Sequence, residues 1–137
     1  MTNHRVTPEE ITSVEWNELF VFGSNESGLH GAGAAKVALA FEAQIGVGFG
    51  PQGNTFAIPT KDWLIQTLPL EVIEHYVKRF IVFAKEMPNI TFLVTAIGCG
   101  LAGYTPAEIA PMFKDAVTVE NIHLPQSFWN ILLNSHL

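Results

Sequence analysis

The chain alternates short apolar runs with longer stretches in which apolar positions recur at helical spacing. A short run rich in aromatic and β-branched residues, ending near glycine or proline, predicts a strand. Such runs occupy residues 18–23 (ELFVFG), 55–60 (TFAIPT), 89–98 (NITFLVTAIG) and 118–125 (TVENIHLP). The run at 89–98 is almost continuously apolar, which is typical of a strand covered on both faces.

The stretches between these runs have helical patterns. They predict helices over residues 34–46, 68–87, 105–116 and 126–137. In the longest of them, Val72, Tyr76, Phe80 and Phe83 recur at three- and four-residue spacing, so they form one apolar face. We expect Tyr76, Phe80 and Phe83 on this face to pack inward.

Two further segments carry signals for a helix start. Thr105-Pro106, with Glu108 three residues after the threonine, has the pattern of a capping box. Residues 1–17 are polar and predict a short lead-in, with one helical turn after Thr7-Pro8.

The alternation of strands and helices predicts an α/β fold. We expect one domain over residues 1–137, built as a three-layer α/β/α arrangement around a central mixed, largely parallel sheet. The strand side chains that we expect in its core are Phe20, Phe22, Phe92 and Val94. Ligands of such sheets bind beyond the carboxyl ends of the strands, so the loops after 18–23, 55–60 and 89–98 are the candidate site.

Composition narrows the range of partners. The chain has 137 residues, 48% of them hydrophobic, with a formal net charge of −6 and no cluster of Lys and Arg. We therefore expect no extended duplex DNA as partner, because binding phosphates along a duplex needs cations. No apolar run is long enough to cross a membrane, the opening MTNHRVTPEE lacks the apolar core of a signal peptide, and the single cysteine fits a reducing cytoplasm.

Two glycine-rich loops are candidate anion sites. In the first, Gly28, His30, Gly31 and Gly33 precede a helix, where backbone N–H groups can approach a phosphate. A tight turn that needs positive φ would explain these glycines equally well. His30 could line the site, and an ordinary loop histidine explains it at least as well. A formal GxGxxG at Gly48–Gly53 contains Pro51 and precedes a strand, so we interpret it as plain loop.

The second loop repeats this design before the capped helix. It spans the residues Gly98, Cys99, Gly100, Leu101, Ala102, Gly103 and Tyr104. Two such loops side by side could hold a diphosphate, and Tyr104 could stack on a ring or pack against its own helix. Cys99 is expected to be structural or to line the ligand, because no histidine stands near it in sequence. The five histidines have no metal-ligand spacing, so we expect neither a metal nor a cofactor.

Lys61 is the most informative single residue. It follows Pro59-Thr60 at a predicted strand end, which places Thr60 and Lys61 at the ligand edge of the sheet. The amine could clamp a phosphate or, in its neutral form, act on the anomeric carbon of a sugar. A solvated lysine paired with Asp62 is an equal alternative.

Three motifs, taken in order, resemble the macrodomains. More closely, residues 19–119 resemble the branch that contains glutamate ADP-ribose hydrolases and antitoxins that remove ADP-ribose from thymidine in DNA. That branch has an Asn followed by G-x-x-G-x-G, then [I/P]-T-K, then [I/L]-G-C-G. Here these are Asn25 with Gly28, Gly31 and Gly33, then Pro59-Thr60-Lys61, then Ile97-Gly98-Cys99-Gly100.

The resemblance implies a nucleotide ligand such as ADP-ribose, with Asn25 at the distal ribose and Lys61 as the catalytic residue. Two features differ from the family pattern. Residues 1–18 lack the usual Gly-Asp motif that recognises adenine, and Ala102 stands where the glutamate hydrolases have Asp. We therefore consider three functions: an ADP-ribosyl hydrolase, a non-catalytic ADP-ribose reader, and an accessory domain whose site is vestigial.

Overall fold

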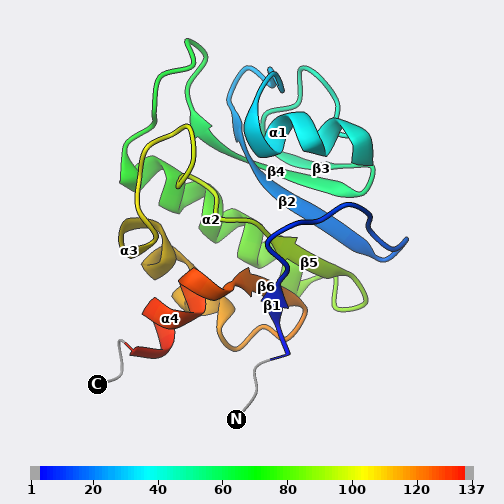
Figure 1. The fold of residues 1–137 in the computed structure, drawn as a ribbon, viewed down its shortest axis with the longest axis vertical. Coiled ribbons are helices and arrows are strands. Elements are labelled where there is room, and N and C mark those ends of the chain that lie inside the picture. Colours follow the sequence, from blue (N-terminus) through cyan, green and yellow to red (C-terminus); the bar gives the residue numbers. More distant parts are fainter. Residues whose placement is uncertain (1–3, 135–137) are drawn as a thin grey trace.

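The structure, a computed structural model, describes residues 4–134 and contains one six-stranded mixed sheet (Figure 1). Its strands are β1 (Val6–Thr7), β2 (Glu18–Asn25), β3 (Gly50–Gln52), β4 (Thr55–Lys61), β5 (Thr91–Val94) and β6 (Ile122–Pro125). They are ordered β1-β6-β5-β2-β4-β3, and every neighbouring pair is parallel except β3–β4. The predicted α/β class with a largely parallel sheet is therefore confirmed.

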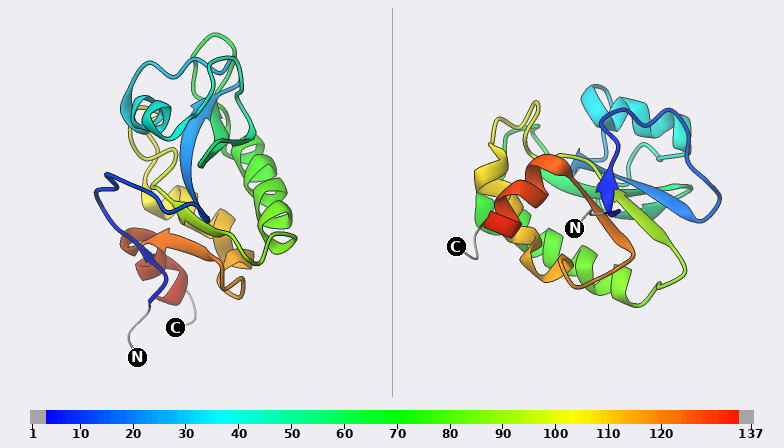
Figure 2. Two further views of the ribbon diagram at one scale, coloured as in Figure 1. Left: turned by 90° about the vertical axis from the view of Figure 1, so that its right-hand side faces the viewer. Right: turned by 60° about the horizontal axis from the view of Figure 1, so that its bottom comes forward.

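Within residues 4–134, four α-helices and two 3₁₀ helices accompany the strands, all but α4 lying between two strands. They are α1 (Gly33–Ala38) continued by η1 (Leu39–Phe41), α2 (Leu70–Lys85), α3 (Pro106–Ile109) continued by η2 (Ala110–Ala116), and α4 (Gln126–Asn134). In the left view of Figure 2, α1 and α2 lie on opposite sides of the sheet. The alternation of side chains along β2 explains this arrangement, because Val21 joins the core under α2 while Phe20 and Phe22 face α1.

The side chains expected in the core are buried there. Phe20, Phe22, Phe92 and Val94 are all at most 3% exposed. Along α2, Phe80 is buried, and Tyr76 and Phe83 are partly buried against the same core. Val72, at the start of this face, is 36% exposed, whereas Ile73, Val77 and Ile81 are buried.

Residues 4–17 differ from the prediction. Residues 1–3 lie outside the described part of the chain. No helical turn follows Thr7-Pro8. Val6–Thr7 instead pairs with Leu124–Pro125 as an edge strand. The extended residues after it contribute Ile11 and Val14 to the α1 side of the sheet, so that side is covered by an extended segment as well as by a helix.

Two predicted helices are shorter or less regular than expected. The segment 34–46 leaves the helix after Phe41, where Asn54 N–H donates to the Phe41 carbonyl and Gln44 N–H donates to the Gln52 side chain. These bonds to the β3–β4 hairpin replace helical ones. The segment 105–116 turns from α to 3₁₀ around Pro111, because proline has no N–H to continue an α-helix. The end of the predicted closing helix, residues 135–137, lies outside the described residues.

Candidate functional site

Three strand ends meet at one edge of the sheet. Asn25 of β2 and Lys61 of β4 are direct neighbours in the register, just after a register shift between Ser24 and Asn25. On the other side of β2, β5 pairs through Val94 with Val21. The loops after these strands, named here the first loop (26–32), the second loop (62–69) and the third loop (95–105), therefore surround one space.

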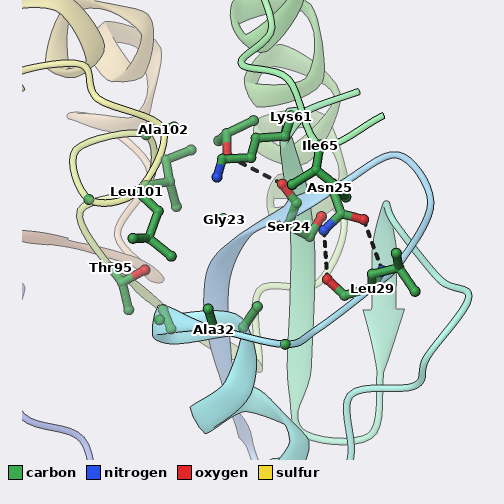
Figure 3. Close-up of a pocket in the computed structure, with 18 of the residues that line it drawn as sticks. Gly23, Ser24, Asn25, Leu29, Ala32, Lys61, Ile65, Thr95, Leu101 and Ala102 are labelled. Atoms are coloured by element: carbon green, nitrogen blue, oxygen red, sulfur yellow. Dashed lines mark hydrogen bonds between the residues drawn. The ribbon is translucent and has the colours of Figure 1, made fainter. Parts of the chain in front are cut away.

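That space is a cleft of about 500 Å³, which is within the usual range for small-molecule sites (Figure 3). The strand ends contribute Gly23, Ser24, Asn25, Thr60 and Lys61 to its lining. All three loops and the start of α1 supply the remainder.

Unpaired backbone amides are the main polar feature of the cleft. The N–H groups of residues 31–35 and 100–102, all in its lining, donate to no acceptor within residues 4–134. Gly31 and Gly100 also face open space, since a Cβ built on either would meet no atom within 4 Å. Such clusters of amides are suited to anions.

Lys61 is the only ionisable side chain among the lining residues that the structure describes. Figure 3 shows it directed into the cleft, between Asn25 and the side of Leu101 and Ala102. The expected alternative, an ion pair with Asp62, does not form: within residues 4–134 the structure has one ion pair, Lys78–Glu74. The Asp62 carboxylate instead accepts from Leu64 N–H and Gln66 N–H, at 2.8 and 3.0 Å.

Asn25 organises the first loop. Its Oδ1 accepts from Leu29 N–H at 2.8 Å, while Nδ2 donates to the Leu29 carbonyl at 2.6 Å (Figure 3). Oδ1 also accepts from Ser27 Oγ at 2.7 Å. With 7% of the residue exposed, one remaining amide hydrogen is what Asn25 can offer to a ligand. Its position beside Lys61 is the one expected from the sequence. Its three side-chain hydrogen bonds, however, hold the first loop in place.

The second loop presents Ile65 to the cleft in an unusual conformation. Ile65 has φ 63°, in the left-handed region, which costs a residue other than glycine about 1–2 kcal/mol. The Asp62 carboxylate and the bond from Ile65 N–H to the Asp62 carbonyl close this turn. Thr67 Oγ1 then donates to the Ala102 carbonyl at 2.9 Å, which joins the second loop to the third.

The third loop is anchored by its aromatic residue. Tyr104 donates its hydroxyl to the Leu68 carbonyl at 2.7 Å, and a Cβ at Gly98 would lie 2.9 Å from Ile109. Tyr104 is thus hydrogen-bonded to the second loop and partly buried against the core, which is a structural role. Cys99 is half-buried against the core, and this burial raises the pKa of its thiol to about 11. It is unsuited to nucleophilic chemistry near neutral pH.

The cleft contains most of the predicted site residues. Those in its lining are Asn25, Gly31, Gly33, Thr60, Lys61, Gly98, Gly100, Leu101 and Ala102. Those outside it are Gly28, His30, Cys99, Gly103 and Tyr104.

His30 and Gly28 are placed away from the ligand for structural reasons. His30 is 4% exposed, with its ring edge-on to Phe22 and Nε2 within 2.9 Å of the Gln44 carbonyl. Gly28 has φ 73° and passes so close to Gly46 and Val47 that a Cβ there would clash with their backbone. The alternative of a tight turn therefore holds at Gly28.

Sequence reasoning missed several lining residues. Ser24, Leu29, Ala32, Ile65 and Thr95 carry no motif of their own, and Ile97 was quoted in a motif but not expected to line the site. Asp62 in DWLIQ is a signal for a turn, because Asp commonly hydrogen-bonds its own backbone there, but it does not single out Ile65. Thr95 follows β5 directly, and its hydroxyl donates to the Val21 carbonyl at 2.8 Å.

Other kinds of site find little support in the part of the chain that the structure describes. Within residues 4–134, no group of His, Cys, Asp and Glu side chains could hold a metal ion. None of the helices described there has the length and apolar character needed to cross a bilayer. Comparisons with protein-family models, curated proteins and solved structures gave no match to this chain.

Proposed function

We propose that the protein binds ADP-ribose or a related nucleoside diphosphate in the cleft, within a three-layer, macrodomain-like fold. One observation carries the proposal: unpaired amides of residues 31–35 and 100–102 and the Lys61 ammonium share a cleft whose described lining has no carboxylate. In a chain with a net charge of −6, this is a local preference for anions.

The arrangement suggests how the ligand would lie. A diphosphate would accept from the amides of both glycine-containing loops, and the distal ribose would lie at the paired strand ends of Asn25 and Lys61. Asn25 would hold the first loop and donate its remaining amide hydrogen to a ribose hydroxyl.

We further propose that Lys61 performs hydrolysis of an ADP-ribosyl bond. As a neutral amine, its Nζ would form a bond to C1″ while the bond from C1″ to the leaving group breaks and the leaving group takes a proton from the alkylated amine. Water would then form a bond to C1″ as the C1″–Nζ bond breaks, which releases ADP-ribose and restores the amine. As an ammonium, it would instead stabilise the charge on the leaving group.

A second candidate function is a non-catalytic reader of ADP-ribose. Ala102 lines the cleft where a carboxylate would be needed in the resembled glutamate hydrolases, and the described lining offers no Asp, Glu or His as general base. Lys61 alone would then serve as a phosphate or sugar clamp.

Binding is tested by calorimetry and thermal unfolding with ADP-ribose. At a hundredfold excess over Kd, we expect the melting temperature to rise by roughly 5–10 °C. AMP and ribose 5-phosphate serve as ligands that lack the diphosphate. If ADP-ribose gives neither heat nor a shift at millimolar concentration, the proposed function is wrong.

Catalysis is tested by single-turnover release of ADP-ribose from modified thymidine and modified glutamate substrates. We expect Lys61→Ala to lower the rate at least about a hundredfold while changing affinity much less. Lys61→Arg would restore part of an electrostatic role and none of a nucleophilic one. Lys114→Ala, at an exposed position outside the cleft, is the control. Binding without turnover by the parent protein would favour the reader.

A further inference from the structure

Packing in the core does not offset the backbone strain at Ile65. Its left-handed backbone is the kind that glycine or asparagine adopts more easily, yet the residue is β-branched. Ile65 belongs to neither of the two core clusters among the described residues and is 41% exposed. Strain that the fold does not use points to a role at a site.

The place where Ile65 lies defines that role. It lines the cleft beside Lys61 and Asn25, on a turn that is fixed by the Asp62 carboxylate and tied to the third loop through Thr67 and Ala102 (Figure 3). Because hydrogen bonds hold the turn at both ends, the position of the Ile65 side chain is fixed. The methyl groups of Ile65 are therefore a fixed apolar wall at the sugar end of the proposed ligand.

A second apolar wall lies across the cleft. Leu101, also outside both core clusters, is 67% exposed, and its Cδ1 would touch a Cβ placed on Gly33 at 3.5 Å. Figure 3 shows Ile65 and Leu101 on opposite sides of the Lys61 side chain. Between them a group attached to the ligand would meet hydrocarbon on two sides and one cation, with no carboxylate among the described lining residues.

We propose that Ile65 and Leu101 select a ligand whose terminal sugar carries a flat, uncharged ring, and that Ile65 is the main determinant of this specificity. This inference rests on the proposed function and names the group expected on C1″. Apolar walls favour an uncharged ring over a carboxylate or guanidinium, which would lose hydration there without gaining a partner. Lys61 would repel a cationic ring, so the ring is neutral.

The test compares ligands with and without such a ring by calorimetry. The probes are ADP-ribose, NADH, which carries a neutral ring on the corresponding carbon, and ADP-ribosylated thymidine, which carries a nucleobase. We expect the parent to bind at least one ring-bearing probe more tightly than ADP-ribose. Ile65→Gly should lower the affinity for that probe about fivefold or more, and the affinity for ADP-ribose less than about twofold. The probe with the larger loss identifies the source of the ring.

Folding controls keep the test decisive. Because glycine adopts the left-handed backbone freely, Ile65→Gly should not lower the urea midpoint, so a selective loss of affinity cannot be attributed to unfolding. Leu64→Ala changes an exposed residue of the same turn that does not line the cleft, and it should leave all affinities unchanged.

The outcomes separate this inference from the proposed function. If ADP-ribose binds but neither ring-bearing probe binds more tightly, or if Ile65→Gly weakens all probes equally, the specificity role is wrong while the nucleotide site stands. If no probe binds the parent protein, the proposed function fails and this inference with it.

Discussion

Gly28 and Gly100 lack a side chain for different physical reasons. At Gly28, φ is 73° and an added Cβ would lie 2.4 Å from backbone atoms of Gly46 and Val47. At Gly100, an added Cβ would meet nothing within 4 Å. The first glycine is required by the fold, and the second is required only if something else occupies the space.

Substitution should separate these two requirements. We expect Gly28→Ala to lower the free energy of unfolding by at least about 2 kcal/mol, since it combines a left-handed backbone with a clash. Gly100→Val should change the free energy of unfolding by less than about 1 kcal/mol. It should lower the affinity for ADP-ribose about tenfold, because the valine side chain fills the position expected for phosphate. Urea unfolding and calorimetry measure the two effects. Undiminished binding by a folded Gly100→Val protein would remove the third loop from the anion site.

At the level of elements, the start of α3 fixes the end of the third loop. Glu108 Oε1 accepts from Thr105 N–H at 3.0 Å and from Thr105 Oγ1 at 3.1 Å, and the capping box predicted from the sequence is present. One carboxylate oxygen thus holds the residue at which the loop becomes helix.

Removing this cap should have a modest and specific cost. We expect Glu108→Ala to lower the free energy of unfolding by about 1 kcal/mol, because the N-cap amide loses its acceptor. Glu108→Gln keeps an acceptor oxygen and should cost less than half as much. Equal losses in the two variants, measured by urea unfolding, would show that the cap hydrogen bond is not the source of the effect.

The elements that sequence predicts well are those whose signal is local. The strands around Val21, Ile58 and Phe92 carry continuous apolar runs, so their parallel direction and the convergence of their loops follow from general rules for α/β sheets. The strands β1 and β3 have two and three residues and no pattern of their own. They exist because other strands pair with them: β1 pairs with β6 at the far end of the chain, and β3 pairs with the neighbouring β4 in a hairpin.

The same distinction applies to the site. Asn25 and Lys61 could be placed together because strand ends of a parallel sheet meet at one edge. Ile65 could not, since its importance lies in a dihedral angle and in the absence of core packing. His30 was misplaced because a sequence gives no sign of which face of a loop turns toward the core.

Across the whole molecule, Arg5 joins segments that are far apart in the chain. Its guanidinium donates to the carbonyls of Ala116, Val117, Val119 and Ile122, at 2.7 to 3.0 Å. It also lies 5.0 Å from the ring of Trp129, whose Nε1 donates to the Arg5 carbonyl. Burial lowers the pKa of the guanidinium, and Glu120 opposes this shift.

Loss of this side chain should destabilise the protein more than loss of an exposed arginine. We expect Arg5→Ala to lower the free energy of unfolding by about 3 kcal/mol, because several carbonyls lose a charged donor. Arg5→Lys should recover little, since a single ammonium cannot serve the spread of acceptors that a guanidinium reaches. Arg79→Ala, which removes a cation resting on Phe49 at the surface, should cost about 1 kcal/mol or less. Similar losses for Arg5→Ala and Arg79→Ala in urea unfolding would contradict this role.

The pairing of β1 with β6 also has a consequence for how the chain folds during its synthesis. Every strand and loop around the cleft is complete by residue 105, whereas Arg5 and Val6 must wait for partners between residues 116 and 129. Contacts over such separations form late, because closing a long loop costs entropy before any contact repays it. On the ribosome, the cleft could therefore assemble while its neighbouring sheet edge, at β5, is still bare. That exposed edge would be the point at which nascent chains are most prone to associate with one another. The risk ends when β6 emerges, pairs with β5 and is bonded by Arg5.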